Sequence, residues 1–266
     1  MSWALVSAAY SRTRRREFAA ACLQGACLLV PEDGPAVNLT TGDVVLTPHG
    51  TRHTLTDPGR AGAQGPTALL CGGYQLDRSR PHPLLGTLPE TIHRPSQVGR
   101  HQDLSAAVSL LGAELQNPRP GTDAALPTLL DLLLLYVLRA WIEDESARGT
   151  TGWPAALADP AIGNALHAIH DDPAKPWTVE ALGKKANLSR ATFSRRFAAL
   201  VGEPPLTYVT WWRLTVAERL LRNSDTALAP IAQHVGYSSP FAFATAFKRE
   251  HGVSPGRYRL RHRDQS

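Results

Sequence analysis

Two short segments near the carboxyl end of the 266-residue chain carry basic and hydroxyl side chains at helical spacing. The first contains Arg190, Thr192, Ser194, Arg195 and Arg196, and the second contains Thr245, Lys248 and Arg249. Arginine can donate two hydrogen bonds to one guanine, and both lysine and arginine neutralise phosphates. The expected chemistry of these segments is therefore recognition of a nucleic acid.

The first segment divides into two faces when it is drawn as a helix. With Phe193 as the origin and about 100° per residue, Phe197 lies at about +40°, Ala191 at about 160° and Arg195 at about 200°. The phenylalanines are therefore expected in the core and Arg195 is expected to bind guanine. The two hydroxyl residues of this helix are expected to touch bases or phosphates, and its flanking arginines, Arg190 and Arg196, to bind phosphate.

The second segment has the same plan with a less polar outer face. Phe243 and Phe247 form its core stripe, and the outer residues are Phe241, Thr245, Lys248 and Arg249. Phe241 has two open interpretations, contact with a thymine methyl group or packing against its own turn. We therefore expect mostly phosphate contacts and shape readout from this helix, and most of the sequence selectivity from the first.

Both segments belong to a repeat, which indicates two helix-turn-helix units. Phe197, Gly202, Pro205, Tyr208 and Arg213 recur as Phe247, Gly252, Pro255, Tyr258 and Arg263, always 50 residues later. Asn187 and Gly236 are expected at the tight turns, since both tolerate positive φ. Ser189 and Ser239 are placed to cap the helices that follow. Residues 206–221 are predicted as one helix of about 24 Å that spaces two recognition helices on one duplex.

Charge supports a polyanion partner for this half of the chain only. Residues 160–266 hold 15 Lys/Arg and 8 Asp/Glu, a net charge of +7, whereas residues 1–159 hold 13 and 15, a net charge of −2. A basic half joined to a weakly acidic half is typical of a nucleic-acid binder with a separate second domain.

The repeat resembles the AraC/XylS-type DNA-binding domain over about residues 160–266. The segments WTVEALGKKANLSRATFSRRFAALVGEPPLTYV and IAQHVGYSSPFAFATAFKREHGVSPGRYR are similar to its first and second halves. The resemblance implies sequence-specific regulation of transcription, usually activation, by a monomer that reads two adjacent major grooves. It also implies base-reading roles for Ala191, Ser194 and Arg195 in the first helix, and for Pro240, Phe241 and Thr245 in the second.

The amino-terminal half reads as β-rich over residues 17–80, with short apolar runs between Gly, Pro and Asp turns. Residues 42–53, from Gly42 to His53 with Pro48 and Gly50 between them, resemble the second signature of the cupin barrel. The first signature's histidines are missing from residues 17–25, so no metal and no cofactor are expected. His53 is more often a structural histidine than a ligand.

Leucine- and alanine-rich residues 103–116 and 124–143 predict two helices after the strands. The second is apolar on nearly every side, so it must be buried on more than one face, either in its own domain's core or in a homodimer. The domains are therefore expected to be 1–95 (cupin-like sensor), 96–145 (helical connection, with dimerisation open), 146–160 (linker) and 161–266 (double helix-turn-helix).

Cys22, Cys27 and Cys71 all lie in the sensor half and form no CxxC pair. They read either as small buried hydrophobes or as thiols that sense oxidants, and sensing requires an accessible thiol of low pKa. With His53 they are the candidate sensor residues.

These observations predict an α+β multidomain protein, with a cupin-like β-barrel and trailing helices before an all-α carboxyl-terminal domain. The expected function is a cytoplasmic, sequence-specific transcription regulator that answers a small ligand or an oxidant. Its expected partners are double-stranded DNA and RNA polymerase, and no membrane. The rival interpretations are a cupin-type metalloenzyme with an appended DNA-binding domain and a non-specific architectural DNA binder.

Overall fold

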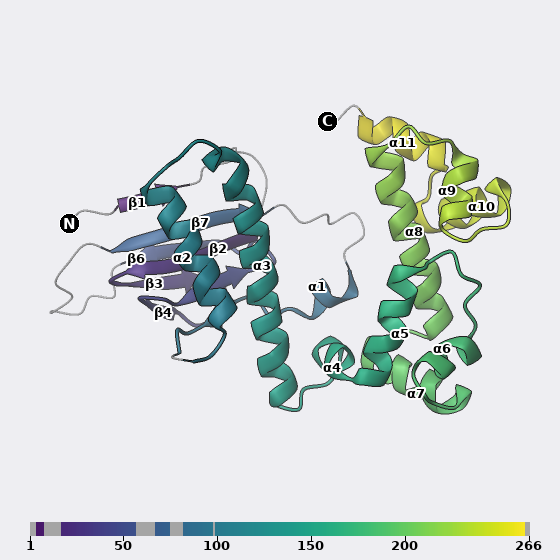
Figure 1. Cartoon of the computed structure of the whole chain (residues 1–266), viewed down its shortest axis with the longest axis horizontal. Coiled ribbons are helices and arrows are strands. Elements are labelled where there is room, and N and C mark those ends of the chain that lie inside the picture. The colour runs from purple at the N-terminus through teal and green to yellow at the C-terminus, as the bar shows by residue number, and fades with distance from the viewer. Residues whose placement is uncertain (1–3, 8–16, 57–66, 75–81, 98, 264–266) are drawn as a thin grey trace. The chain divides into compact units, whose positions relative to one another are not determined.

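The computed structural model describes residues 4–7, 17–56, 67–74, 82–97 and 99–263 (Figure 1). The chain divides into two compact units, Met1–Arg148 and Gly149–Ser266. The first unit holds strands packed against two long helices, and the second is all helical. The predicted α+β class, with strands in the amino-terminal part and helices alone in the carboxyl-terminal part, is confirmed.

The described strands of the first unit form two sheets. The larger has the order β1 (Ala4–Ser7), β7 (Ala68–Tyr74), β2 (Glu17–Gln24), β5 (Val44–Thr47) and β8 (Ile92–Arg94). The smaller has the order β4 (Val37–Thr40), β3 (Ala26–Pro31) and β6 (His53–Thr56). β1 pairs with β7 in parallel, and the other recorded pairings are antiparallel.

The larger sheet is buried on both faces, and this explains its apolar sequence. Along β2, Ala19 and Ala21 face one hydrophobic cluster, whereas Ala20 and Cys22 face another. The second cluster includes Leu29 of β3, so it fills the space between the two sheets. Successive side chains of a strand point to opposite faces, and a strand covered on both sides therefore needs apolar residues at every position.

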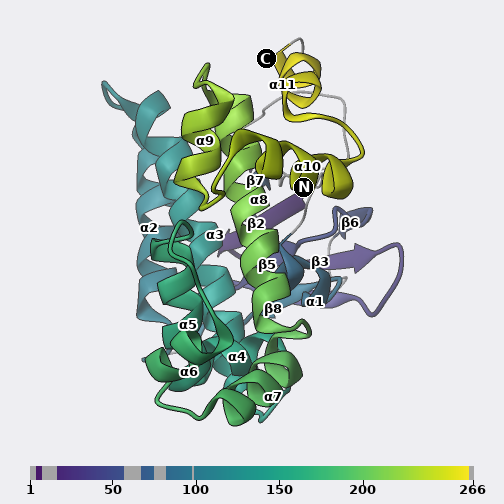
Figure 2. The same cartoon turned by 90° about the vertical axis from the view of Figure 1, so that its right-hand side faces the viewer.

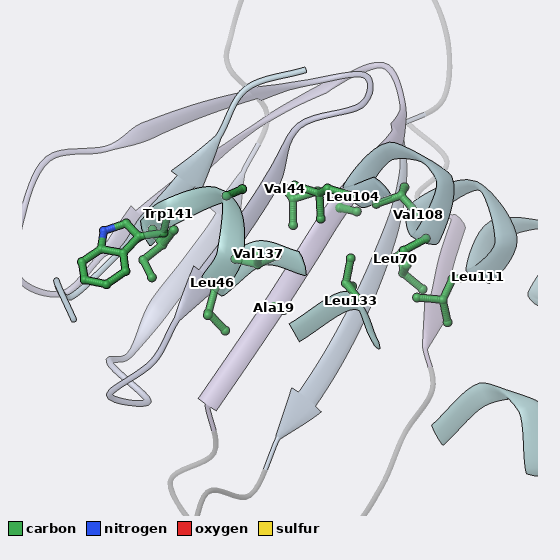
Figure 3. Close-up of a cluster of buried hydrophobic side chains, with 14 of the residues drawn as sticks. Ala19, Val44, Leu46, Leu70, Leu104, Val108, Leu111, Leu133, Val137 and Trp141 are labelled. Carbon is green, nitrogen blue, oxygen red and sulfur yellow. The ribbon is translucent and has the colours of Figure 1, made fainter. Parts of the chain in front are cut away.

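Helices α2 (Gln102–Gln116) and α3 (Thr122–Ala147) cover the other face of the larger sheet (Figures 1 and 3). Leu104 and Val108 of α2 and Leu133 and Val137 of α3 are all buried in that cluster. The two predicted helices are therefore confirmed. By length and composition α3 is apolar enough to cross a membrane, yet one of its sides packs on the sheet.

The end of α3 is tied to the rest of the first unit by a buried carboxylate. Asp144 forms ion pairs with Arg94 of β8 and with Arg100, and His101 lies 3.4 Å from it. Asp144 is 9% exposed and Arg94 is 7% exposed. Because an unpaired buried charge is costly, this cluster holds the last turn of α3 against β8.

The second unit is built from successive helices around one long central helix. They are α4 (Trp153–Ala158), α5 (Pro160–Asp171), α6 (Val179–Lys185), α7 (Arg190–Val201), α8 (Pro205–Asn223), α9 (Leu228–His234), α10 (Pro240–His251) and α11 (Pro255–Arg263). A short helix, α1 (Pro83–Thr87), belongs to the first unit. Both views place α6 and α7 at one end of α8, and α9 and α10 at the other (Figures 1 and 2). The predicted single spacer helix is confirmed and spans about 28 Å.

The stretch predicted as a linker, residues 146–160, is largely structured. It contains α4, whose Trp153 is 2% exposed and whose Ala156 is fully buried. Gly152 adopts a φ of 82° directly before this helix, and Asp159 caps the next one. The Gly and Pro residues that suggested a linker therefore mark helix ends, and the boundary between the two units, after Arg148, lies inside this stretch.

Candidate nucleic-acid interface

The second unit contains two helix-turn-helix copies that share α8. Copy one consists of helices α5, α6 and α7 with the first half of α8, and copy two consists of the second half of α8 with α9, α10 and α11. Tyr208 and Val209, in the first half of α8, are buried, and the Tyr208 ring contacts Phe197 of copy one. Leu214, Ala217 and Leu221, in its second half, join the core of copy two. One helix therefore supports both copies.

The turn of copy one has the predicted geometry. Asn187 adopts a φ of 54° and Ser189 caps α7 by accepting a hydrogen bond from the Thr192 amide. Gly183, which the sequence analysis did not single out, lets α6 approach this turn closely. A Cβ at Gly183 would lie 3.0 Å from the Leu188 carbonyl oxygen. Close packing at this point fixes the angle at which α7 leaves the turn.

The two faces of α7 are those that its sequence predicts. Phe193 and Phe197 are fully buried, whereas Arg190, Ala191 and Arg195 are exposed. No hydrogen bond or ion pair is recorded for Arg195 with any described residue, so its guanidinium is available to a ligand.

The hydroxyl residues of α7 are less accessible than expected. Thr192 and Ser194 are both half-buried, and the Ser189 hydroxyl donates to the Thr192 hydroxyl oxygen over 3.0 Å. Thr192 therefore belongs partly to the cap of the helix. Ser194 lies beside the exposed arginine at the edge of the outer face.

Arg196, which is predicted to bind phosphate, also has an acidic partner within its own copy. Its Nε donates to Asp159 Oδ2 over 2.7 Å, and its Nη2 forms an ion pair with the same oxygen. The Asp159 side chain is 8% exposed and also caps α5. Because position 196 lies nearer the core stripe than the outer face, its side chain reaches an acidic cap in the same copy. This contact ties α7 to the start of α5.

Copy two repeats these devices with different residues. Gly236 takes the turn position with a φ of 80°, Ser239 caps α10 by accepting from the Ala242 amide, and Pro240 is the first helical residue. Phe243 and Phe247 are fully buried. The predicted turn and cap are therefore confirmed.

The outer face of α10 is open and contains one large apolar side chain. Phe241 is 82% exposed, and Pro240, Thr245, Lys248 and Arg249 are exposed as well. An exposed fraction this high rules out packing of Phe241 against its own turn. No ion pair is recorded for Lys248 or Arg249 with any described residue.

Each copy is closed by a tyrosine that reaches back to its first helix. In copy one the Tyr208 hydroxyl lies 2.8 Å from His170 Nε2 of α5. In copy two the Tyr258 hydroxyl donates to the Glu218 carboxylate of α8, and Glu218 is 2% exposed. Burial lowers the pKa of His170 to about 4, so the imidazole is neutral at physiological pH. The sequence repeat aligned the tyrosines but gave no sign of their partners.

The candidate sensor cysteines lie in surroundings that suit packing and not reactivity. Cys22 and Cys27 are fully buried between the two sheets of the first unit, and Cys71 packs beside them, half-buried. Burial raises the pKa of Cys22, and it raises the pKa of Cys27 and of Cys71 to about 11. An oxidant-sensing thiol requires a low pKa and access, so these surroundings favour the reading of the three cysteines as packing residues.

His53 lies at the edge of the smaller sheet. Its ring packs at a tilt of 41° against that of Phe18, with centroids 4.2 Å apart, and its Nδ1 lies 3.0 Å from the Thr51 carbonyl oxygen. It borders an open hollow of about 660 Å³ that also includes Glu32 and Arg52. Over the described part of the chain no three His, Cys, Asp or Glu side chains are grouped to hold a metal ion.

Comparison with known proteins identifies both units. The cupin family matches residues 2–143, and a helix-turn-helix domain family matches residues 182–261. An AraC-like transcription regulator from Streptomyces antibioticus is 35% identical over 89% of this chain and 84% of its own length. The RCS-specific transcriptional activator RclR of Escherichia coli is 31% identical over 91% of this chain and 83% of its own length.

The chain belongs to the AraC family of transcription regulators. It is a DNA-binding regulator with a cupin-like amino-terminal domain, and the comparisons support this reading and not the metalloenzyme alternative. The DNA-binding domain of the global regulator AdpA, solved with its target DNA, is 36% identical over 40% of this chain and 96% of its own, with a TM-score of 0.38.

Proposed function

We propose that this AraC-family regulator inserts α7 and α10 into two successive major grooves of one duplex, with copy one reading most of the sequence. The observation that carries the proposal is the contrast between the two outer faces. Arg195 on α7 is exposed and pairs with none of the residues that the structure describes, whereas α10 has Phe241 where a base-reading polar group would stand. The length of α8, about 28 Å, is comparable with the spacing of about 34 Å between successive grooves.

Each helix has assigned roles in this proposal. On α7, Arg195 binds guanine, and Ala191 and Ser194 border the base edges. Thr192 contacts the DNA backbone through its half-buried hydroxyl, and Arg190 binds a phosphate. On α10, Phe241 contacts a thymine methyl group, Pro240 and Thr245 approach the bases, and Lys248 and Arg249 bind phosphates.

A base-by-base scan of the operator tests this division. Operators are first obtained by genome-wide selection of bound fragments, and each base pair is then substituted in turn. We expect substitutions under copy one to cost about 1–3 kcal/mol each, and those under copy two to cost less. A more stringent half-site under copy two would contradict the proposal. Equal affinity for all duplexes at one salt concentration, in place of a preference of about 10³ or more, would favour an architectural binder.

The signal proposed for the amino-terminal unit is a small molecule and not oxidation of its thiols. The raised pKa values of Cys22, Cys27 and Cys71 support this choice, because few thiolates are present near pH 7. DNA affinity measured before and after hypochlorite or peroxide treatment is expected to stay unchanged. A shift in affinity that disappears in the Cys71→Ser protein would overturn this part.

We propose that α2 and α3 pair two copies of the chain, and that the regulator acts in the bacterial cytoplasm as an activator in contact with RNA polymerase. One leucine on each helix is exposed, Leu110 of α2 at 54% and Leu135 of α3 at 43%, and this supports the pairing. The relative RclR of Escherichia coli is an activator, and this supports the direction of regulation. Light scattering of Leu135→Glu protein is expected to show monomers, and transcription with purified polymerase tests activation. A dimer that persists in Leu110→Glu/Leu135→Glu protein would contradict the pairing surface.

A further inference from the structure

Arg213 occupies the middle of α8, at the point where that helix passes from copy one to copy two. Tyr208 on one side of it packs in copy one, and Leu214 on the other side packs in copy two. The side chain of Arg213 is half-buried, and the loop between α5 and α6 lies against it.

The guanidinium of Arg213 holds two backbone carbonyls of that loop. Its Nε donates to the Pro173 oxygen and its Nη2 to the Lys175 oxygen, each over 2.7 Å. Desolvation by burial lowers the pKa of Arg213, but arginine stays protonated at every pH that a cell reaches. Charge-assisted hydrogen bonds of this length are about twice as strong as neutral ones.

The same loop is internally rigid. The Lys175 amide donates to Asp172 Oδ1, and the Trp177 indole donates to the Asp172 carbonyl oxygen over 2.8 Å. Trp177 is 7% exposed, with the Lys175 ammonium 4.6 Å from its ring centroid. Because the loop is held by these bonds, it keeps a fixed position relative to copy one and can position the residues that it contacts.

The loop touches the turn of copy two at Gly236. A Cβ built on Gly236 would lie 2.7 Å from the Ala174 oxygen and 2.8 Å from Arg213 Nη2. The loop of copy one and the turn of copy two thus meet beside the Arg213 guanidinium. The backbone of Ala174 lies directly against the backbone of Gly236. Gly236 is therefore required twice, for its φ of 80° and for this close approach.

We propose that Arg213 is a positioning residue that fixes the spacing between the two recognition helices, and with it the spacing of half-sites that the protein accepts. The inference rests on the two-groove reading under Proposed function. Two binding modules joined rigidly gain affinity only when the target presents both sites at the matching distance. One added base pair moves a half-site by about 3.4 Å and rotates it by about 35°.

The test measures the affinity of the full-length protein for operators whose half-sites are separated by the native spacing, one base pair more and one base pair less. A duplex that keeps only the copy-one half-site is the fourth target. Unaltered protein is expected to bind the altered spacings about 100-fold more weakly than the native one. In Arg213→Ala protein, affinity for the native operator should fall about 10-fold and the spacing penalty to about 10-fold, with half-site affinity unchanged.

Two further variants and a control keep the result interpretable. Arg213→Lys retains the charge and reaches one carbonyl, so an intermediate spacing penalty is expected. Gly236→Ala keeps Arg213 but puts a methyl group against both its guanidinium and the Ala174 carbonyl, so it pushes the loop away from the turn and should also relax the spacing preference. Arg219→Ala, an exposed arginine on the same helix, should keep the full penalty, since it removes charge alone. If Arg213→Ala lowers the melting temperature so far that binding is lost, the Lys and Gly236 variants carry the same comparison.

Equal loss of affinity on every target, half-site included, would show a merely structural role and overturn the inference. An unchanged spacing penalty in Arg213→Ala protein would do the same while leaving the two-groove reading intact. If unaltered protein binds every spacing equally, the two-groove reading fails and the inference fails with it.

Discussion

In copy one, Phe193 and Phe197 are fully buried with ring centroids 5.4 Å apart, and in copy two Phe243 and Phe247 are fully buried with centroids 5.6 Å apart. The outer faces of the same two helices have little in common. Arg195 is exposed on α7, whereas Phe241 is 82% exposed on α10. The repeat has thus kept what packs one helix against its neighbours and has changed what each helix presents to DNA.

The closing tyrosines show a second difference between the copies. Tyr208 meets a neutral histidine, and Tyr258 meets a buried carboxylate. The equivalent tyrosines of the two copies are therefore held by hydrogen bonds that differ in strength and in pH dependence. Copy two has the stronger anchor and the less polar outer face, and copy one has the reverse.

The largest effects are expected where the copies agree, in their cores. Phe197→Ala and Phe247→Ala should each lower the free energy of unfolding by about 3–5 kcal/mol, because each removes a fully buried ring. Since both cores include part of α8, amide hydrogen exchange should show both copies losing protection together in either variant. Phe241→Ala deletes the same side chain from an exposed position and should change stability by about 0.5 kcal/mol or less. Loss of protection in one copy alone would show that the copies unfold separately.

The next largest effect separates the outer faces. Arg195→Ala should weaken binding to the preferred operator by about 1–3 kcal/mol and relax specificity at one position under copy one. Thr245→Ala, the matched change on α10, should cost less and leave the preference order of bases intact. The measurement is competition binding against operators substituted at each position. An unchanged base preference in Arg195→Ala protein would remove the main support for unequal reading.

The turns, caps and core residues of the two copies could be predicted from the sequence because they depend on local spacing. Asn187, Gly236, Ser189 and Ser239 were predictable because turns and caps depend on residues within three or four positions of one another. The same local logic gave the core phenylalanines of α7 and α10 from their spacing.

Pairings between distant segments were not predictable. The sequence predicts Arg196 as a phosphate ligand and gives no sign of its hydrogen bond to Asp159, which lies 37 residues away. Arg213 holds carbonyls 38 and 40 residues away, and a backbone acceptor leaves no trace in residue type. The pKa of the Cys22 thiol also depends on its burial between two sheets, and the sequence alone does not show that burial.

The anchors of the two copies should respond unequally to the loss of one oxygen. Tyr258→Phe removes a donor from the buried Glu218 carboxylate and should cost about 1–3 kcal/mol. Tyr208→Phe removes a hydrogen bond to a neutral ring and should cost about 1 kcal/mol. Urea denaturation of the two variants side by side measures the difference. Equal costs would mean that the charge of Glu218 adds nothing to its bond.

A pH titration should reveal the histidine anchor of copy one. Burial lowers the pKa of His170 to about 4, below the ordinary value of about 6.5. Between these values the unfolded chain binds a proton that the folded chain does not, so the free energy of unfolding should fall as the pH drops from 6.5 to 4. Because the ring is half-buried, we expect about 1 kcal/mol over this window. His170→Gln keeps a polar partner for Tyr208 and should flatten this part of the curve; an identical curve would assign the slope to other groups.

The smallest effect concerns the phosphate contacts assigned to copy two. Lys248→Ala should weaken binding to every sequence by a similar factor of about 2–5 and lower the slope of log affinity against log salt by about 1, because one counterion fewer is released. Lys184→Ala is the matched control, since Lys184 lies on α6 and its ammonium is 3.2 Å from the Glu180 carboxylate. That variant should keep the full slope. If Lys248→Ala instead alters which base is preferred under copy two, α10 reads sequence directly, and the division of labour between the copies has to be abandoned.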